Sequence, residues 1–537
     1  AGWVGQITSN SFMKREFGSK LIEEFFPTVD LREVIDTSGA YIPGHGTPTV
    51  IIVGRRQRPS SDTVRAVLGI RGEPGRPDEP ANGLVWSAIT EHVGEPGYES
   101  AYISVADLPR ADLRTHPWSL SGGGAVDLSQ RLANSSASTL SDYIESIGFA
   151  AITGDDDVFV GGEVVPRSWK TREIPTRAFV EGDKVRDYSI NHPGMAIYPY
   201  IGAEPYLPPV ATVALWPWRT QLRMGLAFGK TRSEKGQEWW EYILPNFPRL
   251  TADHLITFAF VATHNHFVLD RGGKVFKQSA PVIKLPAGAS VEDHLRLLGV
   301  LNSSVACFWL KQNSHNKGEG GGARVEAGYA ARGEAWRETY EFTGTTLKDF
   351  PLPARTPVEP AELIDKLARE LQDRSPAELA KREIPTFEAL DDARRETERL
   401  RALMVAYQEE LDWEYYRIYG LIDDDLTYVG EVPGVALGER AFEIALARRI
   451  KDGEESTWFT HLQQLSTPIT EIPDHFPADY RELLQRRLDA IESNPHIRLL
   501  ERPEYKRRWA SEPWEKEVES ALRGWLLDRV EDRSLWF

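Results

Sequence analysis

The first 55 residues alternate short β-branched runs with one amphipathic run, and this order constrains the fold more than any other feature of the sequence. Residues 3–8 are rich in strand formers, and strands are also predicted at 32–36 and 49–53. Apolar residues recur at helical spacing between the first two, which predicts a helix over 11–26. The order strand, helix, strand, loop, strand predicts the last third of an open α/β sheet that ends in a hairpin.

The Gly-rich loop before the last of these strands, residues 38–48, has two interpretations. Its glycines suit a long hairpin turn, because they adopt positive φ at little cost. The loop also lies at the strand ends, where ligands bind in open α/β sheets, and His45 is there a candidate base. No partner carboxylate for His45 is evident in the sequence, so composition alone leaves both interpretations open.

Two long segments resemble the region just after the catalytic motif of adenine-specific DNA methyltransferases. They are Gln6–Gly18 and Ile35–Ile52, and a further likeness reaches Leu411–Leu421. The closest resemblance is to the PglX family of phage growth limitation and type 2 BREX phage-defence systems. The likeness extends, with gaps, over most of the chain.

This resemblance implies an α/β plus α+β protein with three regions. Residues 1–125 are expected to be the C-terminal remnant of a Rossmann-like methyltransferase sheet, with an inserted excursion. Residues 126–353 are expected to form a mixed α/β domain that recognises the DNA target. Residues 354–537 are expected to form a helical C-terminal region.

Two defining motifs of the family are missing from this sequence. There is no Gly-rich S-adenosylmethionine motif, and the one Asn-Pro dipeptide, Asn494-Pro495, continues with His496 instead of proline and an aromatic residue. The resemblance therefore implies that no catalytic residue lies in this chain. The cofactor S-adenosylmethionine would be bound mainly by residues upstream of Ala1, so the chain is expected to be a C-terminal portion that is inactive alone.

The resemblance also implies two groups of site residues near the N-terminus. In the family, the loop before the last hairpin places an aromatic or apolar side chain against a base rotated out of the duplex. The matching candidates for this target-base pocket are Tyr41, Ile42, Pro43 and His45. Asn10 and Ser11 fall where the family's chain approaches the cofactor pocket.

Charge is unevenly distributed along the sequence. The chain has 80 Asp and Glu against 63 Lys and Arg, a formal net charge of -17, yet residues 167–284 hold sixteen Lys and Arg against ten Asp and Glu. Aromatic residues interleave with these cations, a pattern typical of phosphate and base contact. The predicted DNA-binding residues are Trp169, Lys170, Arg172, Arg177, Arg219, Arg223, Lys230, Arg232, Lys311, Asn313 and Lys317. For any single tryptophan, a core position is the competing interpretation.

Further elements are predicted more coarsely. Strands are expected at 98–108, 255–262 and 275–285, and helices at 128–148, 294–309, 361–373, 377–381, 389–411, 438–449, 480–492 and 515–530. The segment 311–322 is expected to be a polar loop, which either enters a DNA groove or is an ordinary loop. The late helices are either purely structural or an arm that braces the recognition domain or docks proteins of the defence system.

Other features restrict the class of protein. A single cysteine, Cys307, excludes an internal disulfide and a cysteine-based zinc cluster, and fits the cytoplasm. His264 and His266 alternate along a predicted strand, but no third ligand is evident, so no metal is expected. No stretch of about 18 apolar residues exists, so no membrane partner is expected.

The predicted function is the target-recognition and C-terminal part of a site-specific adenine-N6 DNA methyltransferase, which acts in bacterial phage defence. Its predicted partners are double-stranded DNA and other proteins of the defence system. Two alternatives stay open at this point. One is the specificity portion of a fused restriction-modification enzyme, and the other is a non-catalytic module that binds proteins through its acidic helices.

Overall fold

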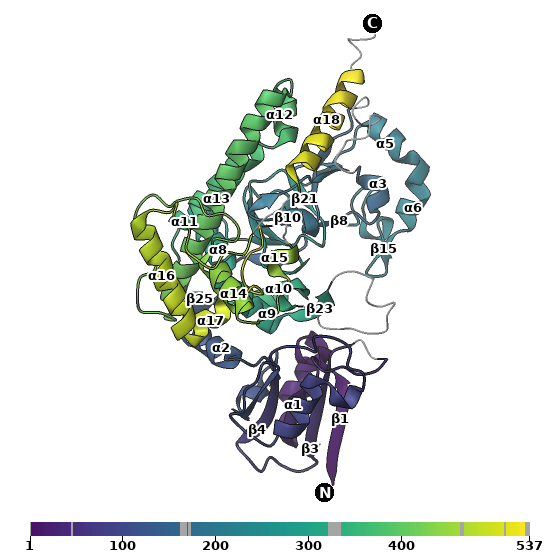
Figure 1. Cartoon of the computed structure of the whole chain (residues 1–537). Helices are drawn as coiled ribbons and strands as arrows, with labels where there is room; N and C mark the ends of the chain where they lie inside the picture. Colours follow the sequence, from purple (N-terminus) through teal and green to yellow (C-terminus); the bar gives the residue numbers. More distant parts are fainter. Residues whose placement is uncertain are drawn as a thin grey trace.

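The computed structural model describes residues 2–44, 47–161, 169, 173–319, 334–461, 467–509 and 512–531. Figure 1 shows an N-terminal sheet at one end of the molecule and a larger body of small sheets and helices beside it. Helix α18 (Trp514–Val530) lies at the opposite end of the molecule from that sheet. The structure is thus mixed α/β, with the N-terminal strands set apart from the rest.

Five strands form the N-terminal sheet, in the order β1-β3-β2-β4-β5. They are β1 (Trp3–Ser9), β2 (Asp30–Asp36), β3 (Thr49–Arg55), β4 (Thr63–Gly69) and β5 (Ile103–Pro109). Strand β3 is antiparallel to both β1 and β2, so β1 and β2 run parallel to each other. Strand β2 also pairs in parallel with β4, and β5 is antiparallel to β4. The three predicted strands and the closing hairpin are confirmed.

The predicted α-helix over 11–26 is wrong. The chain forms short turns instead: the 3-10 helices η1 (Asn10–Met13), η2 (Glu16–Gly18) and η4 (Phe26–Thr28), and the π-helix η3 (Leu21–Phe25). The chain folds back so tightly that a Cβ added to Gly18 would lie 1.8 Å from the Phe12 carbonyl oxygen. This path brings Phe12 and Phe26 together around the buried Trp118, which stacks on Phe26 at 5.2 Å between ring centroids.

A buried carboxylate orders the Pro- and Gly-rich excursion that follows β4. Glu73 accepts hydrogen bonds from the backbone N–H groups of Leu84 (3.0 Å) and Val85 (2.7 Å), at the start of α1 (Leu84–His92). A negative charge at this end of a helix is stabilising, because the unpaired N–H groups point toward it. Helix α1 then packs Val85 and Ile89 against one face of the sheet. The 3-10 turns of this region are η5 (Pro80–Asn82) and η6 (Asp112–Arg114).

Small sheets and short helices make up the middle of the chain. Its strands are β6 (Ser136–Thr139), β7 (Ser146–Gly148), β8 (Ala151–Ile152), β9 (Thr176–Val180), β10 (Val185–Arg186), β11 (Ser189–Ile190), β12 (Gly194–Ile197), β13 (Tyr200–Ile201), β14 (Glu204–Pro205), β15 (Leu226–Ala227), β16 (Lys230–Thr231), β17 (Leu244–Pro245), β18 (Leu255–Phe258), β19 (Val261–Ala262), β20 (Phe267–Asp270), β21 (Lys274–Phe276), β22 (Val282–Lys284), β23 (His315–Glu319), β24 (Glu338–Glu341) and β25 (Pro351–Pro353). Its helices are α2 (Ala125–Asn134), α3 (Asp156–Phe159), α5 (Pro209–Leu215), α6 (Arg219–Met224), α7 (Phe247–Leu250), α8 (Val291–Leu301), α9 (Ser304–Asn313) and α10 (Gly344–Lys348). The 3-10 turns are η7 (Leu140–Asp142), η8 (Gly182–Lys184), η9 (Trp216–Trp218), η10 (Ser233–Lys235) and η11 (Ala335–Arg337).

Two helices predicted in this region are shorter than expected. The predicted helix over 128–148 ends at Asn134, where Ser135 and Ser136 follow, and the chain continues into β6 and β7. The predicted helix over 294–309 is broken into α8 and α9 at Asn302. The side chain of Asn302 accepts a hydrogen bond from the Phe267 amide (3.1 Å) and donates one to the Phe267 carbonyl (2.9 Å), which fixes the break against β20.

The helices predicted in the last third are confirmed, with shifted bounds. They are α11 (Glu359–Asp373), α12 (Pro376–Arg382), α13 (Phe387–Ile418), α14 (Ala441–Lys451), α16 (Ala478–Ser493) and α18, to which the structure adds α15 (Trp458–His461) and α17 (Pro495–Leu500). One hydrophobic core runs from Ala125 to Trp509 and takes residues from both sides of position 353. The N-terminal sheet has separate core clusters. None of the described helices is both long and apolar enough to cross a bilayer.

The N-terminal sheet is joined to the body through Gln312 at the end of α9. The Lys14 ammonium donates to the Gln312 backbone carbonyl, and the Ser119 hydroxyl donates to the Gln312 side-chain oxygen at 2.8 Å. Burial lowers the pKa of Lys14 to about 7, although Asp36 acts in the opposite direction. These polar contacts link two separately cored parts of the protein.

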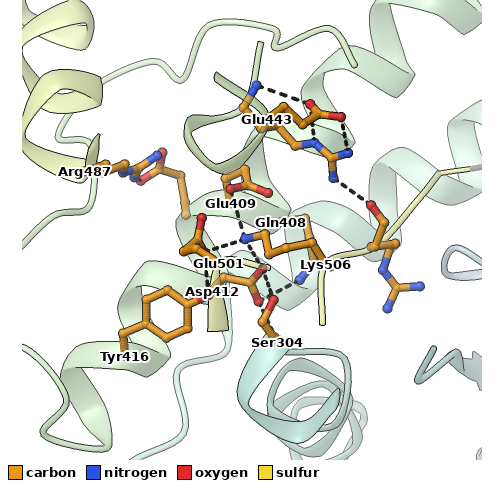
Figure 2. A network of polar contacts seen from close by, with 12 residues as sticks. Ser304, Gln408, Glu409, Asp412, Tyr416, Glu443, Arg487, Glu501 and Lys506 are labelled. Atoms are coloured by element: carbon orange, nitrogen blue, oxygen red, sulfur yellow. Dashed lines mark hydrogen bonds and ion pairs between the residues drawn. The ribbon is translucent and has the colours of Figure 1, made fainter. Parts of the chain in front are cut away.

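A buried ionic network joins the C-terminal helices to the middle of the chain (Figure 2). The ammonium of Lys506 is fully buried and lies within 3.1 Å of Glu409, 3.0 Å of Asp412 and 2.9 Å of Glu501. Asp412 also accepts hydrogen bonds from the backbone N–H and the hydroxyl of Ser304, both at 2.7 Å, at the start of α9. Burial alone would lower the pKa of Lys506, but the three carboxylates raise it above its ordinary value.

Two further buried ion pairs flank Lys506. Arg440 and Glu443 form a doubly hydrogen-bonded pair on α14, with N–O distances of 2.8 and 2.9 Å. Arg487 on α16 contacts Glu410 on α13 at 2.8 Å. Arg487 thus ties α16 to α13, and Arg440 also donates to the Arg507 carbonyl at 2.6 Å, which ties the start of α14 to the segment that holds Lys506. Each of these buried charges has a partner of opposite sign.

We predict that Lys506→Met destabilises the protein by about 3–5 kcal/mol, because three carboxylates would stay buried without their cation. Urea denaturation followed by circular dichroism measures this loss. Adding Glu409→Gln to the variant should recover part of it, since one uncompensated charge is removed. Lys366→Met on the exposed face of α11 is the matched control and should change stability by less than about 0.5 kcal/mol. Equal midpoints for Lys506→Met and the wild type would contradict the prediction.

Candidate nucleic-acid interface

The first candidate site lies at the edge of the N-terminal sheet where β1 and β2 both end. Because these strands are parallel, Ser9 and Asp36 pair with neighbouring residues of β3, Thr49 and Val50. The Asn10 amide donates to the Pro48 carbonyl at 3.0 Å, so η1 is joined to the loop between β2 and β3. The structure therefore brings the two predicted N-terminal groups of site residues to one edge, at the carboxyl ends of parallel strands.

The loop residues predicted for the target-base pocket are only partly covered. Tyr41 and Ile42 are half-buried, and Pro43 is exposed. The Arg76 guanidinium lies 5.8 Å from the centre of the Tyr41 ring. His45 lies outside the described residues. The role of these side chains as a base pocket stays a prediction.

A hollow of about 560 Å³ opens beside this edge, between β1 and the turns η1–η4. Ser11 is in its wall, and the hydroxyls of Ser9 and Ser11 hydrogen bond to each other at 2.8 Å. The lining side chains are Gln6, Thr8, Ser9, Ser11, Phe12, Arg15, Phe17, Leu21, Phe25, Phe26 and Ile52. This lining offers no carboxylate for a ribose and no Gly-rich turn, so these residues do not by themselves form a site for S-adenosylmethionine.

Arg232 is a structural residue, and the structure removes it from the predicted DNA-binding set. Its side chain is 1% exposed. Its guanidinium donates to the backbone carbonyls of Thr153 (2.7 Å), Glu241 (2.7 Å) and Leu222. All three guanidinium nitrogens are used by the protein itself, so none is left for a phosphate.

Lys311 is likewise buried, with 5% of its surface exposed, so its prediction as a DNA-binding residue is also wrong. Its ammonium donates to the Glu504 carbonyl at 2.5 Å and lies 5.1 Å above the Tyr340 ring. The predicted polar loop over 311–322 is wrong for its described part, which is the end of α9 followed by β23. Lys317 in β23 is exposed and lies 3.9 Å from Glu341.

Three further predicted contacts have partners inside the protein. Asn313 donates to the Trp309 carbonyl at 2.8 Å. Arg177 lies over the Tyr198 ring at 3.6 Å and donates to the Leu250 carbonyl at 3.4 Å. Trp169 packs against the main core. Lys170 and Arg172 lie outside the described residues.

The remaining predicted cations gather on one lobe, residues 209–231. This lobe is α5, η9, α6 and the hairpin of β15 and β16. It carries Arg219, Arg223 and Lys230, and contains no Asp or Glu. The Arg219 guanidinium lies 4.6 Å from the centre of the Trp216 ring, while Arg223 and Lys230 are exposed. Since Arg232 bonds to Leu222 at the end of α6, the buried arginine holds this cationic lobe on the body.

The lobe also exposes apolar side chains that the sequence did not single out. They are Val213, Met224, Leu226 and Phe228, of which Phe228 is the most exposed at 87%. Trp216 and Trp218 are exposed beside them, as the predicted pairing of aromatic residues with cations requires. The sequence could have indicated this surface. Residues 209–231 contain three cations and several large apolar residues but no acidic residue, in a chain that is acidic as a whole.

His264 and His266 are buried in their neutral form. Burial, followed by the positive charges of Lys311, Arg508 and Arg507, lowers the pKa of His264 well below its ordinary value. Burial and the neighbouring Arg186 and Arg507 do the same to the pKa of His266. The Nδ1 atom of His266 accepts hydrogen bonds from Arg507 (2.8 Å) and from the Asp187 amide (3.4 Å).

These histidines predict a pH dependence of folding. They stay neutral in the folded state, whereas the unfolded chain takes up protons below about pH 6.5. The free energy of unfolding should therefore fall as the pH drops below 6.5, by about 1.4 kcal/mol per pH unit for each histidine. His266→Asn, whose side-chain oxygen can replace Nδ1, should remove one histidine's share of this slope in urea titrations at pH 5.0–7.5. A slope unaffected by His266→Asn would refute the assignment.

Comparison with curated proteins finds a relative along the whole chain. The adenine-specific methyltransferase PglX of Streptomyces coelicolor is 48% identical over 557 aligned residues. The alignment covers 100% of this chain and 45% of that protein, so the chain spans less than half the length of this curated relative. The resemblance to PglX seen in the sequence segments is thereby confirmed. Residues 404–537 also match the family model described as a domain of unknown function, DUF7008.

Solved structures give weaker matches. The type IIL restriction-modification enzyme MmeI in complex with DNA matches with a TM-score of 0.41 and 11% identity, covering 78% of this chain and 47% of that chain. The type IIG restriction endonuclease BpuSI matches with a TM-score of 0.31 and 11% identity, covering 78% of this chain and 48% of that chain. These scores are too low to support an argument about fold or function.

Proposed function

We propose that this chain, a relative of the adenine-specific methyltransferase PglX, is the target-recognition and C-terminal part of a site-specific adenine-N6 DNA methyltransferase. The 48% identity to PglX along the whole chain carries this proposal. The intact enzyme would act in bacterial phage defence, on DNA in the cytoplasm. Its partners would be double-stranded DNA and other proteins of the defence system.

Exposed apolar side chains on the edge strand of the N-terminal sheet support the proposal. Among the described residues, β1 is the last strand on its side of the sheet, yet its side chains Trp3, Val4 and Ile7 are 55–59% exposed. A strand with apolar side chains on both faces is typical of the covered interior of an α/β sheet. In the intact enzyme, further residues would cover β1, and S-adenosylmethionine, held mainly by those residues, would supply the methyl group.

This chain's own residues would hold the DNA and the rotated adenine. Arg219, Arg223 and Lys230 on the lobe would contact phosphates, with Lys317 as a further contact. Tyr41, Ile42, Pro43 and His45 would border the adenine after it leaves the duplex, and Asn10 and Ser11 would lie beside the cofactor. Lys170 and Arg172 remain proposed contacts from the sequence alone.

The packing of the C-terminal helices favours this function over a separate protein-binding module. Asp412 on α13 binds the start of α9, and Arg507 donates to the Asn265 carbonyl at 2.9 Å and to the Asn302 side chain at 2.7 Å. A module that served only to dock a partner would not need to share a core with the region before it. We propose instead that these helices brace the target-recognition region.

The charge of the lobe predicts a salt-dependent affinity for duplex DNA. Each phosphate contact contributes about 0.9 to the slope of log affinity against log salt, so replacing Arg219, Arg223 and Lys230 together by Gln should lower that slope by about 2–3. Fluorescence anisotropy with a labelled duplex at several salt concentrations measures it. The matched control replaces Lys366, Arg395 and Arg399, exposed cations of α11 and α13, and should leave the slope unchanged. No measurable duplex binding by the wild type would favour the protein-binding alternative.

The missing motifs predict that this chain alone transfers no methyl group. Incubation of residues 1–537 with radiolabelled S-adenosylmethionine and an unmodified phage genome should leave the DNA unlabelled. A longer protein that includes the upstream residues is the positive control. Labelled DNA from the 537-residue chain would mean that the chemistry lies within it and would overturn the assignment.

A further inference from the structure

The tip of the lobe is a hairpin turn with an unusual residue in it. Strands β15 and β16 pair Leu226 with Thr231 and Ala227 with Lys230, so Phe228 and Gly229 form a two-residue turn. Both turn residues have positive φ, 52° and 74°. Such turns favour Asn, Asp or Gly in the first position, because a side chain at positive φ crowds the backbone. A phenylalanine there is held in a conformation that it disfavours.

A second hairpin in the same protein shows how contacts inside the protein offset the free-energy cost of an aromatic residue at positive φ. Asp187 and Tyr188 form the turn between β10 and β11, with φ of 43° and 64°. Tyr188 is buried, its hydroxyl donates to the Gln408 side chain at 2.9 Å, and the Arg507 guanidinium lies 5.2 Å from its ring centre. These contacts stabilise the strained aromatic residue from within the protein.

No residue in the described part of the chain gives Phe228 comparable cover. Its side chain is 87% exposed, and its hairpin neighbour Leu226 is 64% exposed. Residues held in strained backbone conformations cluster at active sites and at positions that contact ligands. A bound molecule would supply the contact that the described residues do not give this ring.

The charges around the tip favour a polyanion as the contacting molecule. Lys230 follows the turn directly, Arg223 lies in the last turn of the preceding helix, and residues 209–231 include no acidic residue. The nearby Glu234 is engaged by the backbone amide (2.7 Å) and the hydroxyl (2.8 Å) of Thr231. In Figure 1 the hairpin labelled β15 lies at the end of this lobe nearer to the N-terminal sheet.

We propose that Phe228 is a wedge that inserts between base pairs of duplex DNA, with Lys230 and Arg223 on the flanking phosphates. Apolar side chains that enter a base step partly unstack it and kink the duplex. The ring needs a rigid, exposed support to do so, and a two-residue hairpin provides one. This inference rests on the proposed function, since it takes DNA as the ligand, and it adds a residue that deforms the target.

The wedge can be tested without knowledge of the recognised sequence, by comparing binding to an intact duplex with binding to a duplex in which base stacking is locally weakened. The probes are a labelled 30-base-pair duplex of mixed sequence and the same duplex with one central abasic site. A ring that fills the abasic gap avoids the cost of unstacking, so the wild type should bind the abasic duplex at least about tenfold more tightly. Phe228→Asn should lose this preference while its salt slope stays that of the wild type, because no charge is removed.

Asn suits positive φ, so Phe228→Asn should keep or raise the thermal midpoint, and loss of the hairpin cannot explain its effect. Phe387→Asn is the matched control, since Phe387 is also 87% exposed but lies on α13, and it should keep the wild-type preference. If the wild type binds both duplexes and Phe228→Asn keeps the same preference, or if the wild type shows none, the wedge is refuted and the proposed function stands. If the wild type binds neither duplex, the proposed function fails and the wedge fails with it.

Discussion

The ammonium group of Lys506 holds together parts of the chain that are far apart in sequence. It is surrounded by carboxylates from α13 and from the segment after α17, and one of those carboxylates also caps α9. Removing these charges from water is costly, and the arrangement is stable because each charge has close partners. Specific pairing of this kind allows few alternative packings. The residue that follows, Arg507, extends the same link to Asn302 and to the Asp187–Tyr188 turn. The strained turn at Tyr188 and the C-terminal helices thus depend on one buried polar centre.

The sequence predicted the N-terminal strands well because each is a short, uniform apolar run between clear turn residues. It failed on 11–26, where helical spacing was real but Gly18 permits a fold-back that brings Phe12 and Phe26 to the same core. Spacing along the chain does not report such a close approach of backbone to backbone. The C-terminal helices were predictable because their charged faces and apolar faces repeat regularly over many turns.

The site residues were harder to predict because charge alone does not reveal burial. Arg232 and Lys311 look like surface cations in the sequence, yet each is held by backbone carbonyls, and Thr153 and Glu504 are remote in sequence from the cations they bind. The opposite error concerns Phe228, which looks like a core residue and is exposed at a hairpin tip. The predicted cations that remain in the described part of the chain are Arg219, Arg223 and Lys230 on the lobe that Arg232 anchors, together with Lys317 on β23. The loop over 38–48 and the cationic lobe belong to separately cored parts of the protein, and the contacts made by Gln312 join those parts.

Strand β1 has a consequence for any experiment with this chain. Its outer edge leaves a row of N–H and C=O groups without a neighbouring strand among the described residues, and its exposed side chains are large and apolar. An edge of this kind is a template on which a second polypeptide can add a strand. At high concentration, the 537-residue chain should therefore self-associate through β1, and its solubility should depend on how well that edge is capped.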